Sequence, residues 1–221
     1  MQKHMKNLMI SGDSYSTFEG CIPQGNAVYY TQTPRPETDV RQAKETWWGR
    51  LVAASGANLV LNDSWSGSTI GFTGYENRDC SKDSSFIYRL RKLYGEGFFD
   101  KNGVDTLLVF GGTNDSWANA PLGVPMFSGW TERDLYEVLP AICYLMHFIK
   151  TALPEVNAYF IVNTELKKEI TECFRLASER YGVKTVFLTE FEKRCGHPTV
   201  NGMRSIFEQV FARLKQEGVI G

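Results

Sequence analysis

The sequence predicts a layered α/β sandwich built around a parallel sheet. Short apolar runs bounded by turn residues alternate with longer helical patterns, which is typical of βαβ units. Several runs, such as residues 106–110, are almost entirely apolar, as expected for strands covered by helices on both faces. The 221 residues are also enough to bury a full α/β core. We therefore expect residues 1–221 to form a single domain with a sheet of about five strands.

The expected strands are short and apolar, and most end close to a turn. They cover residues 7–10, 58–61, 106–110, 158–162 and 185–188. Helical periodicity fills much of the sequence around and between them, at residues 40–54, 84–94, 132–153, 165–181 and 200–215. Pro140 lies inside the third helical pattern and predicts a kink or a break between two helices. Gly182 follows the fourth pattern as a helix stop, which frees the chain to enter the last strand.

Two long segments lack a regular pattern. Residues 15–39 are rich in Thr, Pro, Gln and Gly, and residues 115–129 carry Asn, Pro and Gly between aromatic residues. Long loops inside a compact domain are usually lids or binding loops, or else disordered. Both segments follow predicted strands, so we expect both to lie over a functional site.

The composition excludes several classes of function. A net charge of -1 offers no basic surface for nucleic acid, and no apolar run approaches the ~20 residues that span a membrane. The residues before Ser11 are too poor in apolar side chains for a signal peptide. As it stands the sequence predicts a cytoplasmic protein; it would be secreted or periplasmic if an export signal had been removed. The oligomeric state is left open.

The cysteines predict neither a disulfide framework nor a zinc site. They are odd in number and lack CxxC spacing: Cys21, Cys80, Cys143, Cys173 and Cys195. No HxH or HxxxH pair is present, so we expect no metal and no cofactor. Cys195 lies two residues before a histidine and is the one candidate for a reactive thiol.

Four separated turns carry the residue types of hydroxyl-nucleophile chemistry. In chain order they are Gly12-Asp13-Ser14, Ser66-Gly67, Gly112-Thr113-Asn114-Asp115 and Gly196-His197-Pro198. All except the second directly follow or closely trail a predicted strand, and α/β proteins build their sites at the carboxyl ends of parallel strands. Ser14 is the candidate nucleophile, although a serine reacts only when a base removes its proton.

His197 is the best candidate for that base. His4 lies in the terminal segment, and His147 lies in an apolar helical pattern where a structural role is expected. Only His197 lies in a loop after a predicted strand. The near-neutral pKa of an imidazole suits it to accept the serine proton and to return it to a leaving group.

Acyl transfer also requires hydrogen-bond donors for the developing oxyanion. The side-chain amide of Asn114 is one candidate. The backbone N–H of Gly67 is a second, because a residue without a Cβ lets a ligand approach the backbone closely. The backbone N–H of Ser14 is the third. Each turn alone has an ordinary structural explanation, but together they offer the separate parts of one reaction.

In these four turns the chain resembles the SGNH hydrolases, the GDSL-like esterase and lipase superfamily. The resemblance extends from Ser11 to Gly202; its first, third and last blocks match specifically, and the second rests on spacing. It implies a flavodoxin-like three-layer α/β/α sandwich. It also implies Ser14 as nucleophile, His197 as base, and Ser14, Gly67 and Asn114 as the oxyanion hole. Asp115 would support its turn.

The sequence departs from this family at Arg194. The family places an aspartate three residues before the histidine, where the carboxylate orients the imidazole and stabilises its charged form. Glu192 and Glu190 lie slightly upstream and are candidates to take its place. The alternatives are a backbone carbonyl that orients the ring in a Ser-His dyad, or a weakened or lost activity.

The expected activity is hydrolysis of small acyl esters through an acyl-enzyme at Ser14. Trp65 and Trp117 lie within three residues of an oxyanion donor, and flat aromatic faces stack on sugars or line acyl pockets. O-acetyl groups on carbohydrate are therefore a candidate substrate, although packing is an equally good account of the tryptophans. Two alternatives stay open: a non-catalytic protein that binds glycans or esters on the same fold, and an acyltransferase that uses the same dyad.

Overall fold

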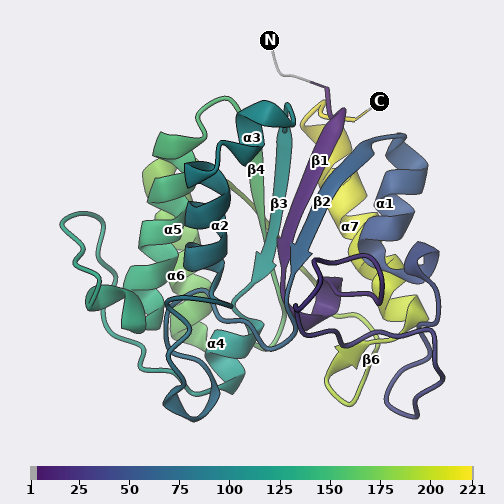
Figure 1. Ribbon diagram of the computed structural model, residues 1–221, viewed down its shortest axis with the longest axis horizontal. Helices are drawn as coiled ribbons and strands as arrows, with labels where there is room; N and C mark the ends of the chain where they lie inside the picture. The colour runs from purple at the N-terminus through teal and green to yellow at the C-terminus, as the bar shows by residue number, and fades with distance from the viewer. Residues whose placement is uncertain (1–3, 221) are drawn as a thin grey trace.

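A five-stranded parallel sheet forms the centre of the protein in the computed structural model, which describes residues 4–220 (Figure 1). The strands are β1 (Asn7–Gly12), β2 (Asn58–Ser64), β3 (Thr106–Gly111), β4 (Asn157–Val162) and β5 (Lys184–Phe187). Their order across the sheet is β2-β1-β3-β4-β5, the order of the flavodoxin-like doubly wound folds. The predicted three-layer α/β/α fold is confirmed.

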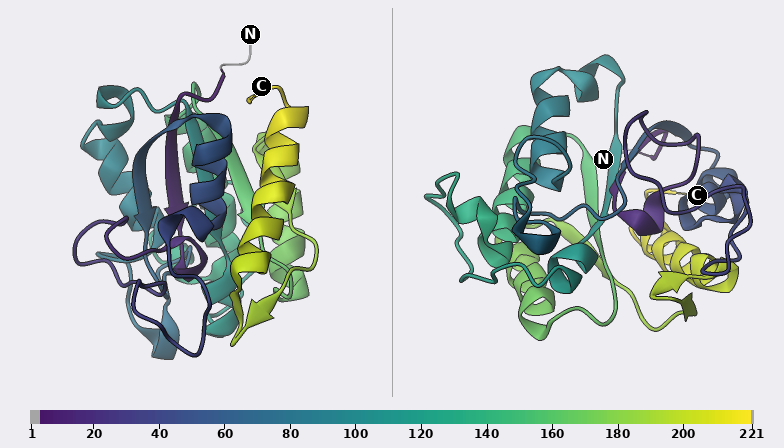
Figure 2. Two further views of the ribbon diagram at one scale, coloured as in Figure 1. Left: turned by 90° about the vertical axis from the view of Figure 1, so that its right-hand side faces the viewer. Right: turned by 60° about the horizontal axis from the view of Figure 1, so that its bottom comes forward.

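Helices cover both faces of the sheet (Figures 1 and 2). One face is covered by α1 (Trp47–Ser55) and α7 (Val200–Gln216); the other is covered by α2 (Phe86–Gly95), α5 (Val138–Ala152) and α6 (Lys168–Tyr181). Successive side chains of a strand point to opposite faces of the sheet. Met9 thus packs on the face covered by α2, α5 and α6, whereas Leu8 and Ile10 pack on the face covered by α1 and α7. This explains why the strands are apolar at nearly every position.

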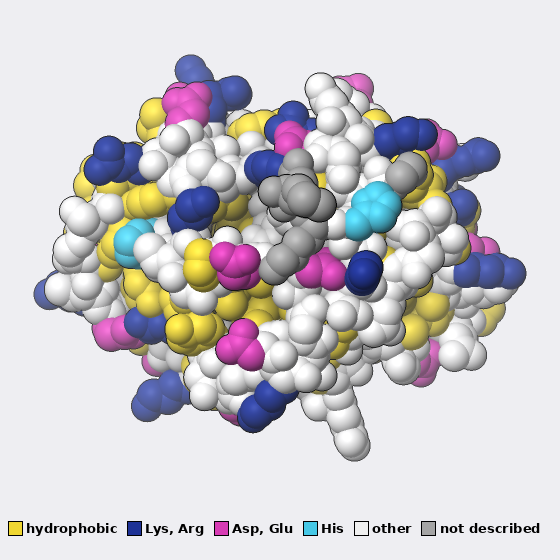
Figure 3. All heavy atoms as spheres, turned by 90° about the horizontal axis from the view of Figure 1, so that it is seen from above, with side chains coloured by type: hydrophobic (Ala, Val, Ile, Leu, Met, Phe, Trp, Pro, Cys, Tyr) yellow, Lys and Arg dark blue, Asp and Glu magenta, His cyan; other side chains and the backbone are white. Residues whose placement is uncertain are grey.

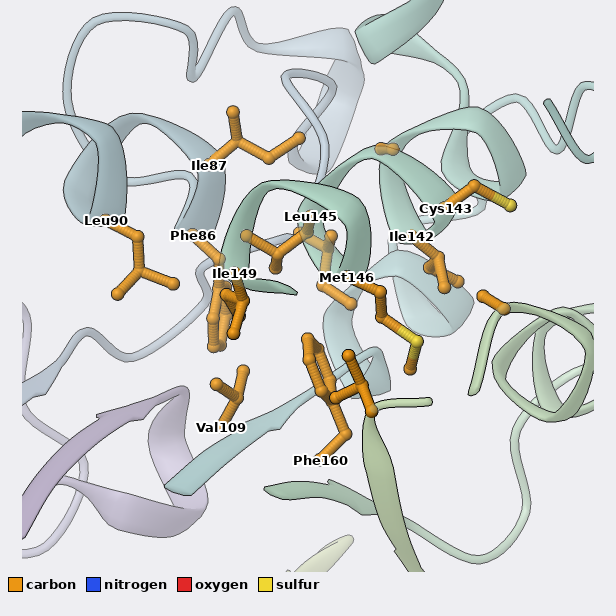
Figure 4. Packing of buried hydrophobic residues seen from close by; sticks show 14 of the residues in the cluster. Phe86, Ile87, Leu90, Val109, Ile142, Cys143, Leu145, Met146, Ile149 and Phe160 are labelled. Carbon is orange, nitrogen blue, oxygen red and sulfur yellow. The ribbon is translucent and has the colours of Figure 1, made fainter. Parts of the chain in front are cut away.

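The larger of the two cores lies between the sheet and α5. Figure 4 shows Val109 of β3 and Phe160 of β4 beneath the apolar face of this helix. The residues of α5 that complete the contact are Ile142, Leu145, Met146 and Ile149, all buried. These four residues have the i, i+3, i+4, i+7 spacing of one buried helix face, and Ile142, Leu145 and Ile149 belong to the apolar series that predicts a helix here.

The ends of two helices follow the predicted signals. The third helical pattern divides at Glu137, between the 3₁₀ turn η4 (Asp134–Tyr136) and α5. Pro140 lies in the first turn of α5, where its missing N–H has no intrahelical acceptor to lose. Gly182 ends α6 with a φ of +65°, a left-handed conformation that favours glycine.

Two further short helices and a small hairpin complete the regular structure. They are α3 (Phe98–Lys101), α4 (Thr113–Trp117) and the antiparallel pair β6 (Lys193–Arg194) and β7 (His197–Pro198). Three more 3₁₀ turns are η1 (Ser14–Ser16), η2 (Ala43–Glu45) and η3 (Tyr75–Asn77). No helix within residues 4–220 is long and apolar enough to cross a membrane.

Only one of the two irregular segments lies at the expected place. Residues 15–39 lie beside the carboxyl ends of the strands, but the chain after α4 runs outward along α5 and α6 (Figure 1). There the backbone N–H of Val138 donates to the Pro121 carbonyl, and the Tyr181 hydroxyl donates to the Phe127 carbonyl. The prediction that residues 115–129 lie over the site is therefore wrong beyond Trp117, because apolar side chains such as Leu122 and Phe127 pack against the helical layer instead.

The two ends of the sheet differ in what they present to solvent. Figure 3 looks onto the amino ends of the strands, where acidic and basic side chains are interspersed among apolar ones. The opposite end carries the turns that follow β1 and β3 (Figure 2, right). This carboxyl end is where the chemistry-bearing residues of the sequence come together.

Candidate active site

The candidate site lies between the carboxyl ends of β1 and β3. Ser14 begins the 3₁₀ turn that follows β1, and Asn114 lies in the first turn of α4, which follows β3. The chain leaves these adjacent strands toward opposite faces, since β1 leads to α1 and β3 leads to α4 and α5. Such a switch point opens a crevice at the sheet edge, and ligands of doubly wound folds bind there.

The turn after β1 holds Ser14 at this crevice. A Cβ at Gly12 would lie 2.5 Å from the Ser16 side chain and 2.6 Å from Ser64 Oγ, so only glycine fits. Asp13 accepts a hydrogen bond from the Tyr15 backbone N–H at 3.0 Å and so caps η1. Burial raises the pKa of Asp13 to about 7. The side chain of Asp13 therefore stabilises the turn that holds Ser14.

His197 lies against the candidate nucleophile. Its Nε2 is 3.0 Å from Ser14 Oγ, and its Nδ1 is 3.1 Å from the Cys195 carbonyl oxygen. A carbonyl only accepts hydrogen bonds, so Nδ1 carries the proton of the neutral ring. Nε2 is then the nitrogen with a free lone pair, and it can accept the proton of Ser14.

A tight hairpin brings the Cys195 carbonyl to the ring. Arg194 pairs with His197 across β6 and β7, and the two residues between them have φ values of +48° (Cys195) and +76° (Gly196). Two positive φ values in a two-residue loop are typical of a type I′ hairpin turn. The imidazole is thus bonded to the backbone of its own hairpin.

Neither candidate glutamate takes the place of the missing aspartate at Nδ1 of His197. The side chain of Glu192 accepts a hydrogen bond from Asn201 Nδ2 at 3.2 Å, and bonds to Thr199 and Asn201 lower its pKa. These partners lie at the start of α7, where a negative charge interacts favourably with the helix dipole. Glu190 is exposed in the segment after β5. A backbone carbonyl, the alternative open from the sequence, is what lies at Nδ1 of His197.

Aromatic side chains surround His197. The ring of Tyr29 stacks on the imidazole with centroids 3.6 Å apart and planes at 8°. Trp117 presents an edge at 5.7 Å, and Tyr15 lies at 5.4 Å. Burial lowers the pKa of His197; the Cys195 carbonyl opposes this effect, and the positive charge of Arg35 adds to it. The imidazole therefore stays neutral to a lower pH than an exposed histidine.

The side-chain amide of Asn114 has a defined orientation. Its Nδ2 donates to the Ser68 carbonyl at 2.9 Å, and its Oδ1 accepts from the Tyr75 hydroxyl at 2.8 Å. Because the Ser68 carbonyl only accepts, the nitrogen must face Ser68. One N–H of the amide is left for a further acceptor.

The remaining turn residues support this arrangement. Gly67 has a φ of +83° in a turn closed by a hydrogen bond from the Ser68 N–H to the Trp65 carbonyl, 3.1 Å long. Asp115 is buried and accepts from the backbone N–H groups of Ile70 and Gly71, which ties α4 to the segment after β2. Burial raises the pKa of Asp115 to about 6. These contacts fit a supporting role for Asp115.

The two candidate tryptophans lie in different places. Trp117 is 41% exposed and lies against Tyr15 and His197, so it borders the Ser14–His197 pair. The side chain of Trp65 lines a hollow beside α2. Of these two tryptophans, only Trp117 lies beside His197.

Two residues of the site escaped the sequence analysis. Tyr29 and Tyr75 lie in irregular segments and belong to no motif, so nothing in their spacing points to His197 or Asn114. The available signal for Tyr29 was its place in the long loop that follows the nucleophile turn. Loops of that kind carry functional side chains out of proportion to their length.

Comparisons with known proteins agree with this architecture. A family model described as GDSL-like Lipase/Acylhydrolase matches residues 6–214. A search among curated proteins gives no match. A crystal structure described as a GDSL-like lipase from Bacteroides ovatus has a TM-score of 0.88 and 39% identity, covering 97% of this chain and 100% of its own. The corresponding structure from Bacteroides uniformis has a TM-score of 0.88 and 42% identity, covering 96% of both chains.

A more distant match shares the fold. An acetyl xylan esterase from Butyrivibrio proteoclasticus has a TM-score of 0.60 and 17% identity, covering 98% of this chain and 65% of its own. Identity this low shows similarity of fold alone. The family model and the two Bacteroides structures each extend over nearly the whole chain, and their agreement shows that the chain belongs to the GDSL-like lipase/acylhydrolase family.

Proposed function

We propose that this protein is a serine esterase that hydrolyses small acyl esters, with Ser14 as nucleophile and His197 as general base. The observation that carries the proposal is the 3.0 Å distance between His197 Nε2 and Ser14 Oγ at the carboxyl end of β1. Membership of the family supports a hydrolase in general. A hydroxyl within hydrogen-bond reach of an unprotonated ring nitrogen can lose its proton as it attacks.

The proposed reaction has two halves. Ser14 Oγ attacks the ester carbonyl carbon while its proton passes to His197 Nε2, and the imidazolium then returns that proton to the departing alcohol. In the second half Nε2 takes a proton from water, whose oxygen attacks the acyl-enzyme. The carbon–Oγ bond breaks, the carboxylic acid is released, and Ser14 recovers its proton. Neither half requires a cofactor or a metal.

Three donors would stabilise the oxyanion in each half. They are the free N–H of the Asn114 amide and the backbone N–H groups of Ser14 and Gly67. Removal of one such donor typically lowers kcat by ~10²–10³. The fixed orientation of the Asn114 amide supports this role, because a donor that is already oriented needs no rearrangement during the reaction.

O-acetyl groups on carbohydrate are the proposed substrate class. Ser14 is only 3% exposed, so an acyl group reaching it must be small, and Trp117, which is 41% exposed, offers an aromatic face near it for a sugar ring. Structures with the same fold include the acetyl xylan esterase and a family two carbohydrate esterase from Clostridium thermocellum in complex with cellohexaose. These resemblances of fold and the aromatic rim support the same class of ester.

The proposal is tested by hydrolysis of p-nitrophenyl acetate. We expect turnover by the wild type and a loss of at least ~10³-fold in kcat for Ser14→Ala. Ser128→Ala, which alters an exposed serine in the loop that runs along α5 and α6, is the matched control and keeps the wild-type rate. Equal rates for Ser14→Ala and wild type would remove Ser14 as the nucleophile.

The same assay with acetylated xylo-oligosaccharides tests the substrate class and the two alternatives. Release of acetate, dependent on Ser14, is the expected result. Tight binding of the oligosaccharide without turnover would favour a non-catalytic binding protein. Transfer of the acetyl group to an added alcohol in preference to water would favour an acyltransferase.

A further inference from the structure

We propose that Tyr29 is a positioning residue that holds the imidazole of His197 in the place of the missing carboxylate. The inference rests on the proposed function, because it assigns Tyr29 a role only if His197 is the base. The phenol ring lies flat on the imidazole, with centroids 3.6 Å apart and planes at 8°. This is the most parallel contact that any ring makes with His197 among the described residues.

His197 needs a second restraint besides its hydrogen bond to Cys195. In a complete triad, the carboxylate fixes the tautomer, orients the ring and stabilises its charged form. The Cys195 carbonyl fixes the tautomer, but one hydrogen bond to Nδ1 leaves the ring free to tilt about that bond. A flat surface against one face of the imidazole removes this freedom and keeps Nε2 directed at Ser14 Oγ.

Tyr29 is itself fastened to the segment that carries the nucleophile. Its backbone N–H donates to Thr17 Oγ1 at 2.9 Å, and the Thr17 hydroxyl donates to the carbonyl oxygen of Ser14 at 3.0 Å. A single threonine thus connects the backbone of the stacking residue to the backbone of the nucleophile. The distance between base and nucleophile is set through this short link as well as through the hairpin.

Arg35 contacts the carbonyl group and the ring of Tyr29. Its guanidinium donates to the Tyr29 carbonyl at 2.7 Å and lies over the phenol ring, 5.2 Å from the centroid. A cation over an aromatic face is attracted by the ring's electrons. Contacts therefore restrain the N–H, the carbonyl and the ring of Tyr29. A residue restrained in this way can keep the His197 imidazole in place.

The groups that face His197 also fit this account. Tyr15, Tyr29, Tyr30 and Trp117 present rings from the segments packed against it, Cys195 and Arg194 lie in its own hairpin, and Arg35 is the cation that acts on it. A neutral ring restrains the imidazole without adding a negative charge beside it. The base is oriented as in a triad but is left less basic than a carboxylate would make it.

The test removes the aromatic surface and separates positioning from packing and substrate contact. Tyr29→Leu and Tyr29→Phe are compared with wild type by kcat, KM and the pH profile for p-nitrophenyl acetate. We expect kcat to fall about 10-fold in Tyr29→Leu, the range of one aromatic contact, with KM changed less than about twofold. Tyr29→Phe keeps the ring and recovers most of the loss.

The pH profile gives a second readout, one that a role of Tyr29 in substrate binding or in global stability alone would not move. Loss of the ring exposes the imidazole to water, which weakens the burial that lowers the pKa of His197. Since the base must be neutral to act, the acid limb of kcat should move to higher pH in Tyr29→Leu. The control is Tyr94→Leu, which removes an exposed tyrosine of α2 beside the amino ends of the strands and leaves the profile unchanged.

Two outcomes would overturn the inference. The first is a Tyr29→Leu protein with kcat within twofold of wild type and an unmoved acid limb of the pH profile. The second is a Tyr29→Leu protein in which only KM rises, which would assign Tyr29 to substrate binding. Urea unfolding checks that Tyr29→Leu is folded. If it is not, the same measurements are made on Tyr29→Met. Failure of the proposed function itself is seen separately, as an unchanged rate in Ser14→Ala.

Discussion

At the residue scale, the side chain of Asn114 shows how neighbours prepare a group before substrate arrives. Tyr75 is 42% exposed, yet its hydroxyl donates a hydrogen bond to Asn114 Oδ1 at 2.8 Å. The Nδ2 of the same amide donates to the Ser68 carbonyl. The amide is held from both ends. Its free N–H therefore has one direction, which is the condition for an effective oxyanion donor.

We predict that Tyr75→Phe lowers kcat for p-nitrophenyl acetate by roughly 10-fold, less than the ~10²–10³ expected for loss of the donor itself. The phenylalanine keeps the ring but no longer fixes Oδ1. The dependence on Asn114 is checked with a double-mutant cycle: in an Asn114→Ala background, Tyr75→Phe should have little further effect. An equal loss in both backgrounds would mean that Tyr75 acts independently of Asn114.

At the element scale, the β6–β7 hairpin sets the orientation of the His197 imidazole through the Cys195 carbonyl. A hairpin this short has its register set by its turn, and here Cys195 takes a left-handed conformation that favours glycine or asparagine. The sequence identified the departure at Arg194 but not the hairpin, because two-residue strands carry no periodic signal. The carbonyl that faces His197 could be proposed only as one of several alternatives.

Arg194→Asp tests this element. Residues directly opposite on paired strands have Cβ atoms ~4.5–5.5 Å apart, so the new carboxylate would face His197 and raise its pKa. Because a base with a raised pKa is protonated at higher pH, the acid limb of kcat/KM should move upward. Arg194→Asn is the control that removes the positive charge alone. Identical acid limbs in the two variants would show that position 194 does not act on the base.

Most of the longer elements were predicted well because their signals are local, although the helix expected from residue 40 begins only at Trp47. Each expected strand is present and several extend one to three residues further, and α7 begins at the predicted Val200. The error at residues 115–129 came from long-range packing: Phe127 meets Tyr181, which lies 54 residues away in the sequence. No local pattern encodes such a contact.

At the scale of the whole molecule, one buried arginine joins segments that the chemistry requires to be adjacent. Arg89 of α2 is 5% exposed; it donates to the Asp63 carboxylate at 2.8 Å, to the Gly12 carbonyl and Ser68 Oγ at 3.3 Å each, and to the Ser84 carbonyl at 3.0 Å. It thus fixes the ends of β1 and β2 and the turn beside Asn114 to one helix.

We predict that Arg89→Met lowers the free energy of unfolding by about 3–5 kcal/mol, because it leaves the Asp63 carboxylate buried without its partner. Lys92→Met on the same helix breaks an exposed ion pair with Glu96 and should cost less than about 1 kcal/mol. Urea unfolding measures both. Similar losses in the two variants would show that the buried pair has no special role in stability.

The same scale explains how much of the site the sequence could reveal. Ser14, Asn114 and His197 carry recognisable turns, and the parallel sheet brings turns at strand ends to one edge, so their meeting follows from topology. Tyr29, Tyr75 and Arg89 reach the site from a loop, a 3₁₀ turn and a helix whose paths depend on tertiary packing. Their roles required the three-dimensional arrangement.

The proposed activity depends on Ser14 as a nucleophile that His197 activates. The most direct measurement is covalent labelling with a fluorophosphonate, followed by intact-mass analysis and peptide mapping. We predict one equivalent of label on the peptide that contains Ser14, slow labelling in His197→Gln and none in Ser14→Ala. A wild-type protein that takes up no label, or a label that persists in Ser14→Ala, would contradict it.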